Sequence, residues 1–202
     1  MTTNKEFFYR RLHSLLGVIP VGIFLMQHLV VNHFATKGPE AFNKASHFME
    51  NLPFRYVLET FIIFLPILFH AIYGFYIAFT AKHNVRQYGY FRNYLFMLQR
   101  ISGIVTFAFI AWHVWETRVQ AALGAEVNYD MMANILDNPA MLAFYIIGIL
   151  STIFHFTNGL WTFAISWGLT VTPRSQKIST YVTLGLFIIL SFVGIRAILA
   201  FT

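Results

Sequence analysis

Four histidines, one in each of four long apolar segments, carry the most informative chemistry of this chain. They are His28, His70, His113 and His155. An imidazole at the depth of a bilayer core is costly unless it has a partner, and ligation of a metal supplies one. Two imidazoles fill both axial positions of a haem iron, which leaves no position for oxygen and favours electron transfer. The pattern therefore predicts two haems, each held by two histidines.

The helices that must position these histidines can be read from five apolar segments. Each is long enough to supply the ~20 helical residues that cross a hydrocarbon core. They are expected near residues 12–32, 54–80, 94–115, 140–168 and 180–201. Hydrophobic residues make up 57% of the chain and charged residues only 11%. We therefore expect an all-α integral membrane protein, a single transmembrane domain over residues 1–202, with the first four helices bundled around two stacked haems.

The depth of each histidine in its helix decides how the four pair. With a rise of 1.5 Å per residue, His28 and His113 are expected ~24–28 Å from the inner ends of their helices, toward the outer face. His70 and His155 lie on helices that run the other way and are expected ~22–24 Å from the outer face. The predicted pairs are thus His28 with His113 at the outer level and His70 with His155 at the inner level. A separation of roughly 15 Å between the levels predicts a transmembrane electron path.

Both histidines of the inner pair open the same short motif, Phe-His-x-x-x-Gly. It reads FHAIYG at residues 69–74 and FHFTNG at residues 154–159. A glycine one turn beyond the ligand gives close approach either to a porphyrin or to a neighbouring helix. Pro20 and Pro66 lie inside expected helices and predict kinks or local repair of the backbone hydrogen bonds.

Polar groups at the inner ends of the first and third helices match what haem propionates require. The candidates for these contacts are His13, Ser14, Arg100 and Ser102. Anchoring of cations at the inner membrane face explains the arginines equally well. The remaining histidines, His33, His47 and His83, are expected at interfaces or in loops, where a solvated imidazole is ordinary.

Cysteine is absent from the chain, which excludes disulfides, iron–sulfur clusters ligated by this chain and covalent c-type haem. The predicted haems are therefore non-covalent. The net charge of +6 comes from cations dispersed at helix ends, so nucleic acid is not an expected partner. The N-terminal segment lacks a signal-peptide cleavage site and is expected to be retained as the first helix.

Orientation follows from the distribution of charge, because cytoplasmic loops are enriched in Lys and Arg. Most of the 14 Lys and Arg residues are expected on the N-terminal side of the membrane. They are Lys5, Arg10, Arg11, Lys82, Arg86, Arg92, Arg100, Arg174 and Lys177. The N-terminus is therefore predicted inside and the C-terminus outside.

The whole chain resembles the cytochrome b membrane-anchor subunit of succinate dehydrogenase, of the five-helix dihaem type found in Gram-positive bacteria such as Bacillus. The segments that carry the resemblance are RRLHSLLGVIPVGIFLMQHLVVNHF, FHAIYG, LQRISGIVTFAFIAWHVWETR, FHFTNGLW and TPRSQ. The resemblance implies residence in the bacterial cytoplasmic membrane, with a partner flavoprotein that carries FAD and oxidises succinate, and an iron–sulfur subunit on the cytoplasmic face. It also implies electron transfer through the inner and then the outer haem b to menaquinone. No residue of this chain is then expected to be catalytic toward succinate.

A quinone near the outer haem would need hydrogen-bond donors for its carbonyl oxygens. Candidates that flank the outer ends of the first and third helices are Asn32, His33, Glu116 and Arg118. Ordinary interfacial anchoring remains an alternative for each. Two other interpretations of the whole chain stay open, the cytochrome b subunit of a hydrogenase or formate dehydrogenase and a haem-free transporter or scaffold. Transporters commonly add buried carboxylates or broken helices, and the expected spans have no Asp or Glu near their middle.

Overall fold

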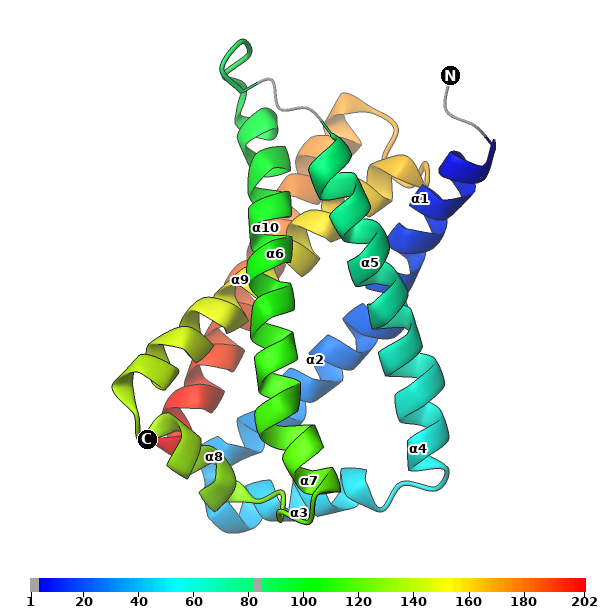
Figure 1. Cartoon of the computed structure of the whole chain (residues 1–202). Coiled ribbons are helices and arrows are strands. Elements are labelled where there is room, and N and C mark those ends of the chain that lie inside the picture. The colour runs from blue at the N-terminus through cyan, green and yellow to red at the C-terminus, as the bar shows by residue number, and fades with distance from the viewer. Residues whose placement is uncertain (1–3, 82–84) are drawn as a thin grey trace.

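The computed structural model describes residues 4–81 and 85–202, so Lys82 and His83 lie outside the described residues. Within these ranges, five helical stretches are long and apolar enough to cross a membrane. They are Asn4–Lys37, Arg55–Thr80, Phe91–Ala122, Pro139–Ser166 and Pro173–Phe201. The predicted all-helical fold with five spans is therefore confirmed. The two termini lie at opposite ends of the bundle (Figure 1), which we call its N-terminal end and its C-terminal end.

The first span is interrupted near its middle. Helix α1 (Asn4–Val18) and helix α2 (Pro20–His33) meet at Ile19, and a 3-10 turn, η1 (Phe34–Lys37), ends the span. Pro20 has no N–H to offer the carbonyl one turn earlier, so the helix breaks there and restarts with proline at its first position. The span begins well before residue 12, where it was expected, and an ion pair of 2.8 Å between Glu6 and Arg10 supports the added turns.

Wide π-helical turns interrupt the second and third spans near the C-terminal end. The second span consists of α4 (Arg55–Leu58), the wide turn η2 (Glu59–Phe64) and α5 (Leu65–Thr80). The third consists of α6 (Phe91–Val114), the wide turn η3 (Trp115–Val119) and α7 (Gln120–Ala122). Pro66 lies two residues after the end of η2, so the hydrogen bond that its missing N–H would have made falls where the helix is already widened.

The fourth and fifth spans are long uninterrupted helices that pack side by side. They are α9 (Pro139–Ser166) and α10 (Pro173–Ile198), with a final 3-10 turn, η4 (Leu199–Phe201). Helix α10 starts at Pro173 instead of near residue 180, because Thr172 and Ser175 form a reciprocal capping box at its first turn. Leu29 of α2, Ile153 of α9 and Leu190 of α10 form a buried cluster, so the fifth helix is anchored on the first and fourth spans.

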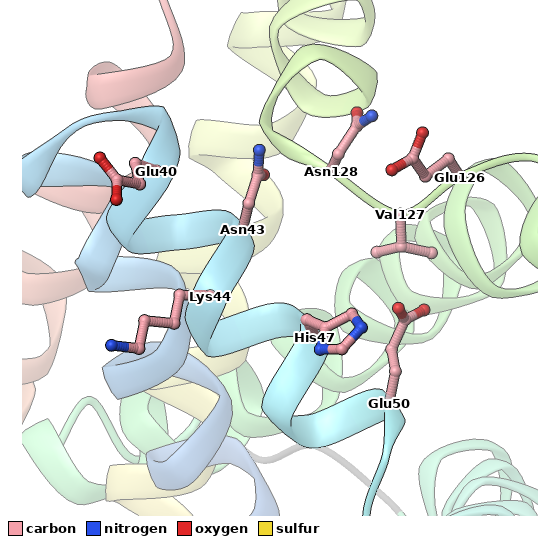
Figure 2. A pocket seen from close by; sticks show the side chains of 8 residues that line it. All are labelled: Glu40, Asn43, Lys44, His47, Glu50, Glu126, Val127 and Asn128. Carbon is pink, nitrogen blue, oxygen red and sulfur yellow. The ribbon is translucent and has the colours of Figure 1, made fainter.

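Two short helices, which lie between the expected spans, cover the C-terminal end (Figure 1). Helix α3 (Pro39–Glu50) and helix α8 (Tyr129–Leu136) turn their apolar sides to the bundle. Phe42 of α3 packs edge-on against Phe201 at 5.0 Å, and the Tyr129 amide donates to Asn43 Oδ1 at 2.7 Å. The polar side of α3 and the segment that leads into α8 border a surface pocket (Figure 2). Its lining residues are Glu40, Asn43, Lys44, His47, Glu50, Glu126, Val127 and Asn128.

Candidate functional site

The four histidines of the apolar segments meet as two pairs between the helices. The ring centroids of His28 and His113 are 5.8 Å apart, and those of His70 and His155 are 6.0 Å apart. A metal bonded on both sides by imidazole nitrogens at about 2 Å places the two ring centroids about 6 Å from each other. The side chains present therefore fit a metal held between two imidazoles in each pair.

The two pairs lie at different levels along the bundle. Gly103 lies against His155, and His113 follows ten residues later on the same helix, a rise of ~15 Å. Tyr145 contacts His113, and His155 follows ten residues later on α9, which gives the same ~15 Å. We call His70 and His155 the N-terminal pair and His28 and His113 the C-terminal pair, after the end of the bundle that each is nearer.

Backbone carbonyls hold both imidazoles of the N-terminal pair. His70 Nδ1 lies 2.9 Å from the carbonyl oxygen of His13, and His155 Nδ1 lies 3.0 Å from that of Gln99. A carbonyl oxygen can only accept, so Nδ1 must carry the proton and a neutral ring then has its lone pair on Nε2. These contacts fix the tautomer and the orientation that ligation through Nε2 requires.

A glycine exposes each of these carbonyls to its imidazole. Gly17 follows His13 by one helical turn and Gly103 follows Gln99 by the same spacing. A Cβ atom on Gly17 would lie 2.4 Å from His70 Cε1, and one on Gly103 would lie 2.9 Å from His155 Cε1. Any side chain at these glycines would therefore push the imidazole away from its acceptor.

The glycines of the two Phe-His-x-x-x-Gly motifs make the reciprocal contact. A Cβ atom on Gly74 would lie 3.2 Å from His13 Nε2, and one on Gly159 would lie 3.2 Å from Gln99 Nε2. These glycines therefore admit a side chain of the neighbouring helix, which is one of the two interpretations that the motif left open. The matching segments LHSLLG (12–17) and LQRISG (98–103) share the spacing of the accepting residue and its glycine. That repeat is the signal which the sequence analysis missed.

Side chains instead of backbone surround the C-terminal pair. The hydroxyl of Tyr145 lies 3.3 Å from His113 Nδ1 and donates to Glu116 Oε2 at 3.0 Å. Asn32 Nδ2 donates to the carbonyl of His28 at 2.9 Å and lies 3.3 Å from His28 Nε2. If His28 Nε2 binds a metal, Asn32 loses only its 3.3 Å contact to that nitrogen and keeps the hydrogen bond to the carbonyl. Tyr145 was not among the residues that the sequence singled out.

The polar candidates on the first helix lie at the level of the N-terminal pair. The ring of His13 stacks on that of His70, with centroids 4.0 Å apart and planes 12° from parallel. The Ser14 hydroxyl donates to the carbonyl of Arg11 at 3.0 Å and accepts from Trp167 Nε1 at 3.0 Å. Ser14 therefore ties α1 to the end of α9, whereas His13 lies directly beside a candidate ligand.

Arg100 and Ser102 on the third span also lie at this level. The Arg100 side chain is buried, stacks over the Phe96 ring at 4.0 Å and donates to the carbonyl of Ala81 at 3.1 Å. The Ser102 hydroxyl donates to the carbonyl of Gln99 at 3.1 Å and lies 3.4 Å from His155 Nδ1. Ser102 thus shares the polar environment of the candidate ligand itself.

The four quinone-region candidates do not form one cluster. Asn32 and Glu116 belong to the surroundings of the C-terminal pair, as described above. His33 Nδ1 instead donates to the carbonyl of Val193 on α10 at 3.3 Å. Arg118 belongs to an ionic network nearer the surface.

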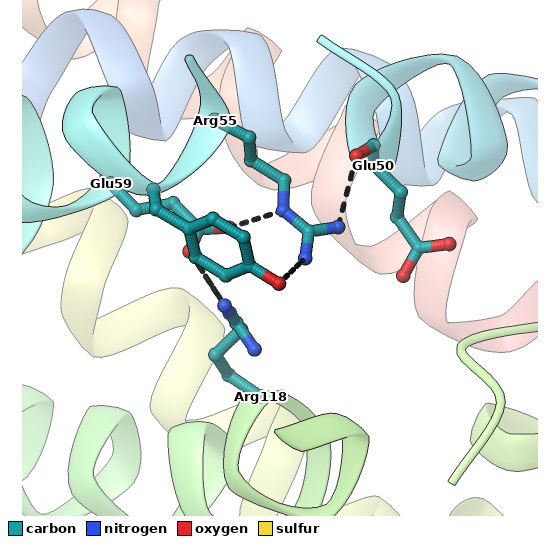
Figure 3. A network of polar contacts seen from close by, with 5 residues as sticks. Glu50, Arg55, Glu59 and Arg118 are labelled. Carbon is teal, nitrogen blue, oxygen red and sulfur yellow. Dashed lines mark hydrogen bonds and ion pairs between the residues drawn. The ribbon is translucent and has the colours of Figure 1, made fainter. Parts of the chain in front are cut away.

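The ionic network connects the two wide turns (Figure 3). Arg118 in η3 donates from Nε at 3.1 Å and from Nη2 at 2.7 Å to the same carboxylate oxygen of Glu59 in η2. Arg55 lies 3.6 Å from the other oxygen of Glu59 and also donates to the Tyr56 hydroxyl and to the Glu50 carbonyl. The network therefore joins the second and third spans on the side where the C-terminal pair lies.

These features define a multi-pass helical membrane protein whose interior carries two histidine pairs at separate levels. The family model of the succinate dehydrogenase/fumarate reductase transmembrane subunit matches residues 85–194. The succinate dehydrogenase cytochrome b558 subunit of Bacillus subtilis (strain 168) is 71% identical over 201 residues, and the match covers 100% of both chains. The chain belongs to the succinate dehydrogenase/fumarate reductase transmembrane subunit family. The family resemblance expected from the sequence is confirmed.

Proposed function

We propose that this chain is the dihaem cytochrome b anchor of a succinate:quinone oxidoreductase, with residues 1–202 as one functional domain. The observation that carries the proposal is the spacing of the two histidine pairs, 5.8 Å and 6.0 Å between ring centroids. The Bacillus subtilis relative is named as a cytochrome b558 subunit, which supports haem b as the cofactor. His28 and His113 would hold one haem, and His70 and His155 the other.

The protein's contribution is to hold, orient and insulate two metal sites. When bound, each haem would carry one electron, one haem at each of the two depths. Hydrogen bonds from Nδ1 to the carbonyls of His13 and Gln99 hold two of the imidazoles with Nε2 available. Phe24 packs near His28 and Phe109 stacks near His113, so aromatic rings exclude water from the C-terminal pair.

Residues at the N-terminal level would also hold the propionates of the haem there. His13, stacked on His70, and the buried guanidinium of Arg100 are the best placed of the four candidates. A cation or an N–H donor pairs strongly with a carboxylate in such surroundings. Ser14 and Ser102 would then add hydroxyl contacts at the same level.

The proposed orientation places the N-terminal end of the bundle in the cytoplasm of a bacterium. The described cations near that end include Arg10, Arg11 and Arg174, as the positive-inside rule requires. A flavoprotein with FAD and an iron–sulfur subunit would dock there, and electrons would leave at the other end to menaquinone. Asn32, His33, Glu116 and Arg118 would line or support that quinone region.

The test is a pyridine haemochrome assay with quantified protein on the purified membrane complex. Two b-type haems per chain are expected. No haem would contradict ligation by both histidine pairs, and one haem would show that one histidine pair is wrongly assigned. Co-purification with a flavoprotein that oxidises succinate tests the proposed partner.

The assignment of the four histidines to two pairs predicts which haem each substitution removes. His70→Ala and His155→Ala should each remove the same haem, and His28→Ala and His113→Ala should each remove the other. Redox titration of the α-band in each variant complex distinguishes the two haems. Loss of one spectral component from all four variants would contradict the pairing, and immunoblots of the subunits control for failed assembly.

A further inference from the structure

The hydroxyl of Tyr145 stands between a candidate ligand and a carboxylate. Within residues 4–81 and 85–202, the N-terminal pair has no such series of hydrogen bonds to a carboxylate. His113 Nδ1 lies 3.3 Å from the Tyr145 hydroxyl, which in turn donates to Glu116 Oε2 at 3.0 Å. Because that hydroxyl gives its proton to the carboxylate, its oxygen can accept from His113 Nδ1–H. The hydrogen bonds are therefore all donated in one direction, from the imidazole through the hydroxyl to the carboxylate.

Close packing of α6 on α9 fixes these hydrogen-bonded side chains in place. Gly148 lies so near Phe109 that a Cβ atom on it would be 2.2 Å from Phe109 Cγ. Tyr145 lies one turn before Gly148 and His113 one turn after Phe109, so the interlocked helices bring hydroxyl and imidazole together. Tyr145 is 1% exposed, and its hydroxyl is therefore shielded from water.

We propose that Tyr145 is a positioning residue for His113 and that Glu116 acts through it to lower the reduction potential of the haem held there. This inference rests on the proposed haem ligation. A hydrogen bond from a ligand imidazole to a partner that carries negative charge makes the ligand more basic and stabilises the oxidised iron. Both imidazoles of the N-terminal pair donate to neutral carbonyls, so the effect is confined to one haem.

The experiment is a redox titration of both haems in the purified complex with Glu116→Gln and Tyr145→Phe. Glu116→Gln keeps an acceptor for the tyrosine hydroxyl but removes the charge, and Tyr145→Phe removes the link. Each variant should raise the midpoint potential of the His28–His113 haem by about 59 mV or more, which is a tenfold change in its oxidised-to-reduced ratio for one electron. The potential of the other haem should stay unchanged.

Tyr129→Phe is the matched control, because it also removes a tyrosine hydroxyl that donates near the C-terminal end, here to the carbonyl of Ala200. It should leave both potentials unchanged. If Tyr145→Phe fails to retain haem, Glu116→Gln decides alone, since the imidazole then keeps its acceptor. Two retained haems with unchanged potentials in Glu116→Gln would overturn the proposal. Retention of both haems by His113→Ala would instead overturn the ligation on which it rests.

Discussion

A backbone carbonyl, unlike a side chain, cannot be deleted by substitution, and two carbonyls hold the imidazoles of the N-terminal pair. What can be changed is the glycine that exposes each carbonyl. Gly17 and Gly103 are occupied on their open side by the rings of His70 and His155. At the scale of single residues, these two glycines are therefore as constrained as the histidines that they admit.

Gly17→Ala should lower the content of the haem held by the N-terminal pair, because the new Cβ atom would lie 2.4 Å from His70 Cε1. Alanine favours a helix more than glycine does, so a loss cannot come from helix propensity. The haem-to-protein ratio and the redox titration of the complex measure the effect. The matched control is Gly185→Ala on α10, where a Cβ atom meets nothing within 4 Å. Full haem content in both variants would show that the imidazole is not confined.

The candidate ligands could be predicted from the sequence, whereas most of their supports could not. A histidine in an apolar segment is conspicuous, and counting residues along a helix gives its depth. The carbonyls of His13 and Gln99 have no side-chain signature, because every residue has a carbonyl. Tyr145 depends on how α6 and α9 interlock at Gly148, and no pattern within either helix reports that contact.

At the scale of elements, the second and third spans share one feature, since each contains a wide π-helical turn. Each turn lies toward the C-terminal end, and each carries one partner of the Glu59–Arg118 ion pair. Wide π-helical turns often occur at functional positions, since they change the direction in which following side chains point. The position of Pro66 predicted a kink or local repair of the helix there. The widened turn at Trp115–Val119 contains no proline, so the sequence carries no such signal for it. Helices α3 and α8 were missed because each, at 12 and 8 residues, is much shorter than a span.

The Glu59–Arg118 pair should stabilise the contact between these turns by about 1 kcal/mol, the upper end of the range for exposed ion pairs, because it is partly shielded. Their side chains are 19% and 29% exposed, and Arg118 makes two hydrogen bonds to one carboxylate oxygen. A double-mutant cycle with Glu59→Gln and Arg118→Gln, read from thermal loss of the haem Soret band, measures the coupling. The more exposed pair Glu6–Arg10 provides the control cycle and should show a smaller coupling. Strictly additive effects at Glu59 and Arg118 would contradict the prediction.

At the scale of the whole molecule, the arrangement of the termini bears on the proposed electron path. They lie at opposite ends of the bundle (Figure 1), and the two histidine pairs are stacked between these ends. If the N-terminal end faces the cytoplasm, the route from one pair to the other crosses the low-dielectric core. The odd number of spans expected from the sequence already predicted termini at opposite ends.

The absence of cysteine makes the orientation easy to test, because any introduced thiol is unique. Lys44→Cys on α3 should react with a membrane-impermeant maleimide in intact spheroplasts, since this exposed position is expected outside. Arg86→Cys, at the other end, should react only after lysis. The reverse pattern would invert the proposed topology, and labelling of both in detergent controls for accessibility.

The order of the histidines along the chain means that the two pairs are completed at different points of synthesis. Both histidines of the C-terminal pair are present once α6 has been made, whereas the N-terminal pair lacks its second histidine until α9 follows. Helix α9 also brings Tyr145 to the earlier pair. A nascent chain of three spans can therefore bring His28 and His113 together, but the fourth span completes both levels at once. Insertion of α9 is thus the step that supplies both the last histidine of the N-terminal pair and the hydroxyl beside His113.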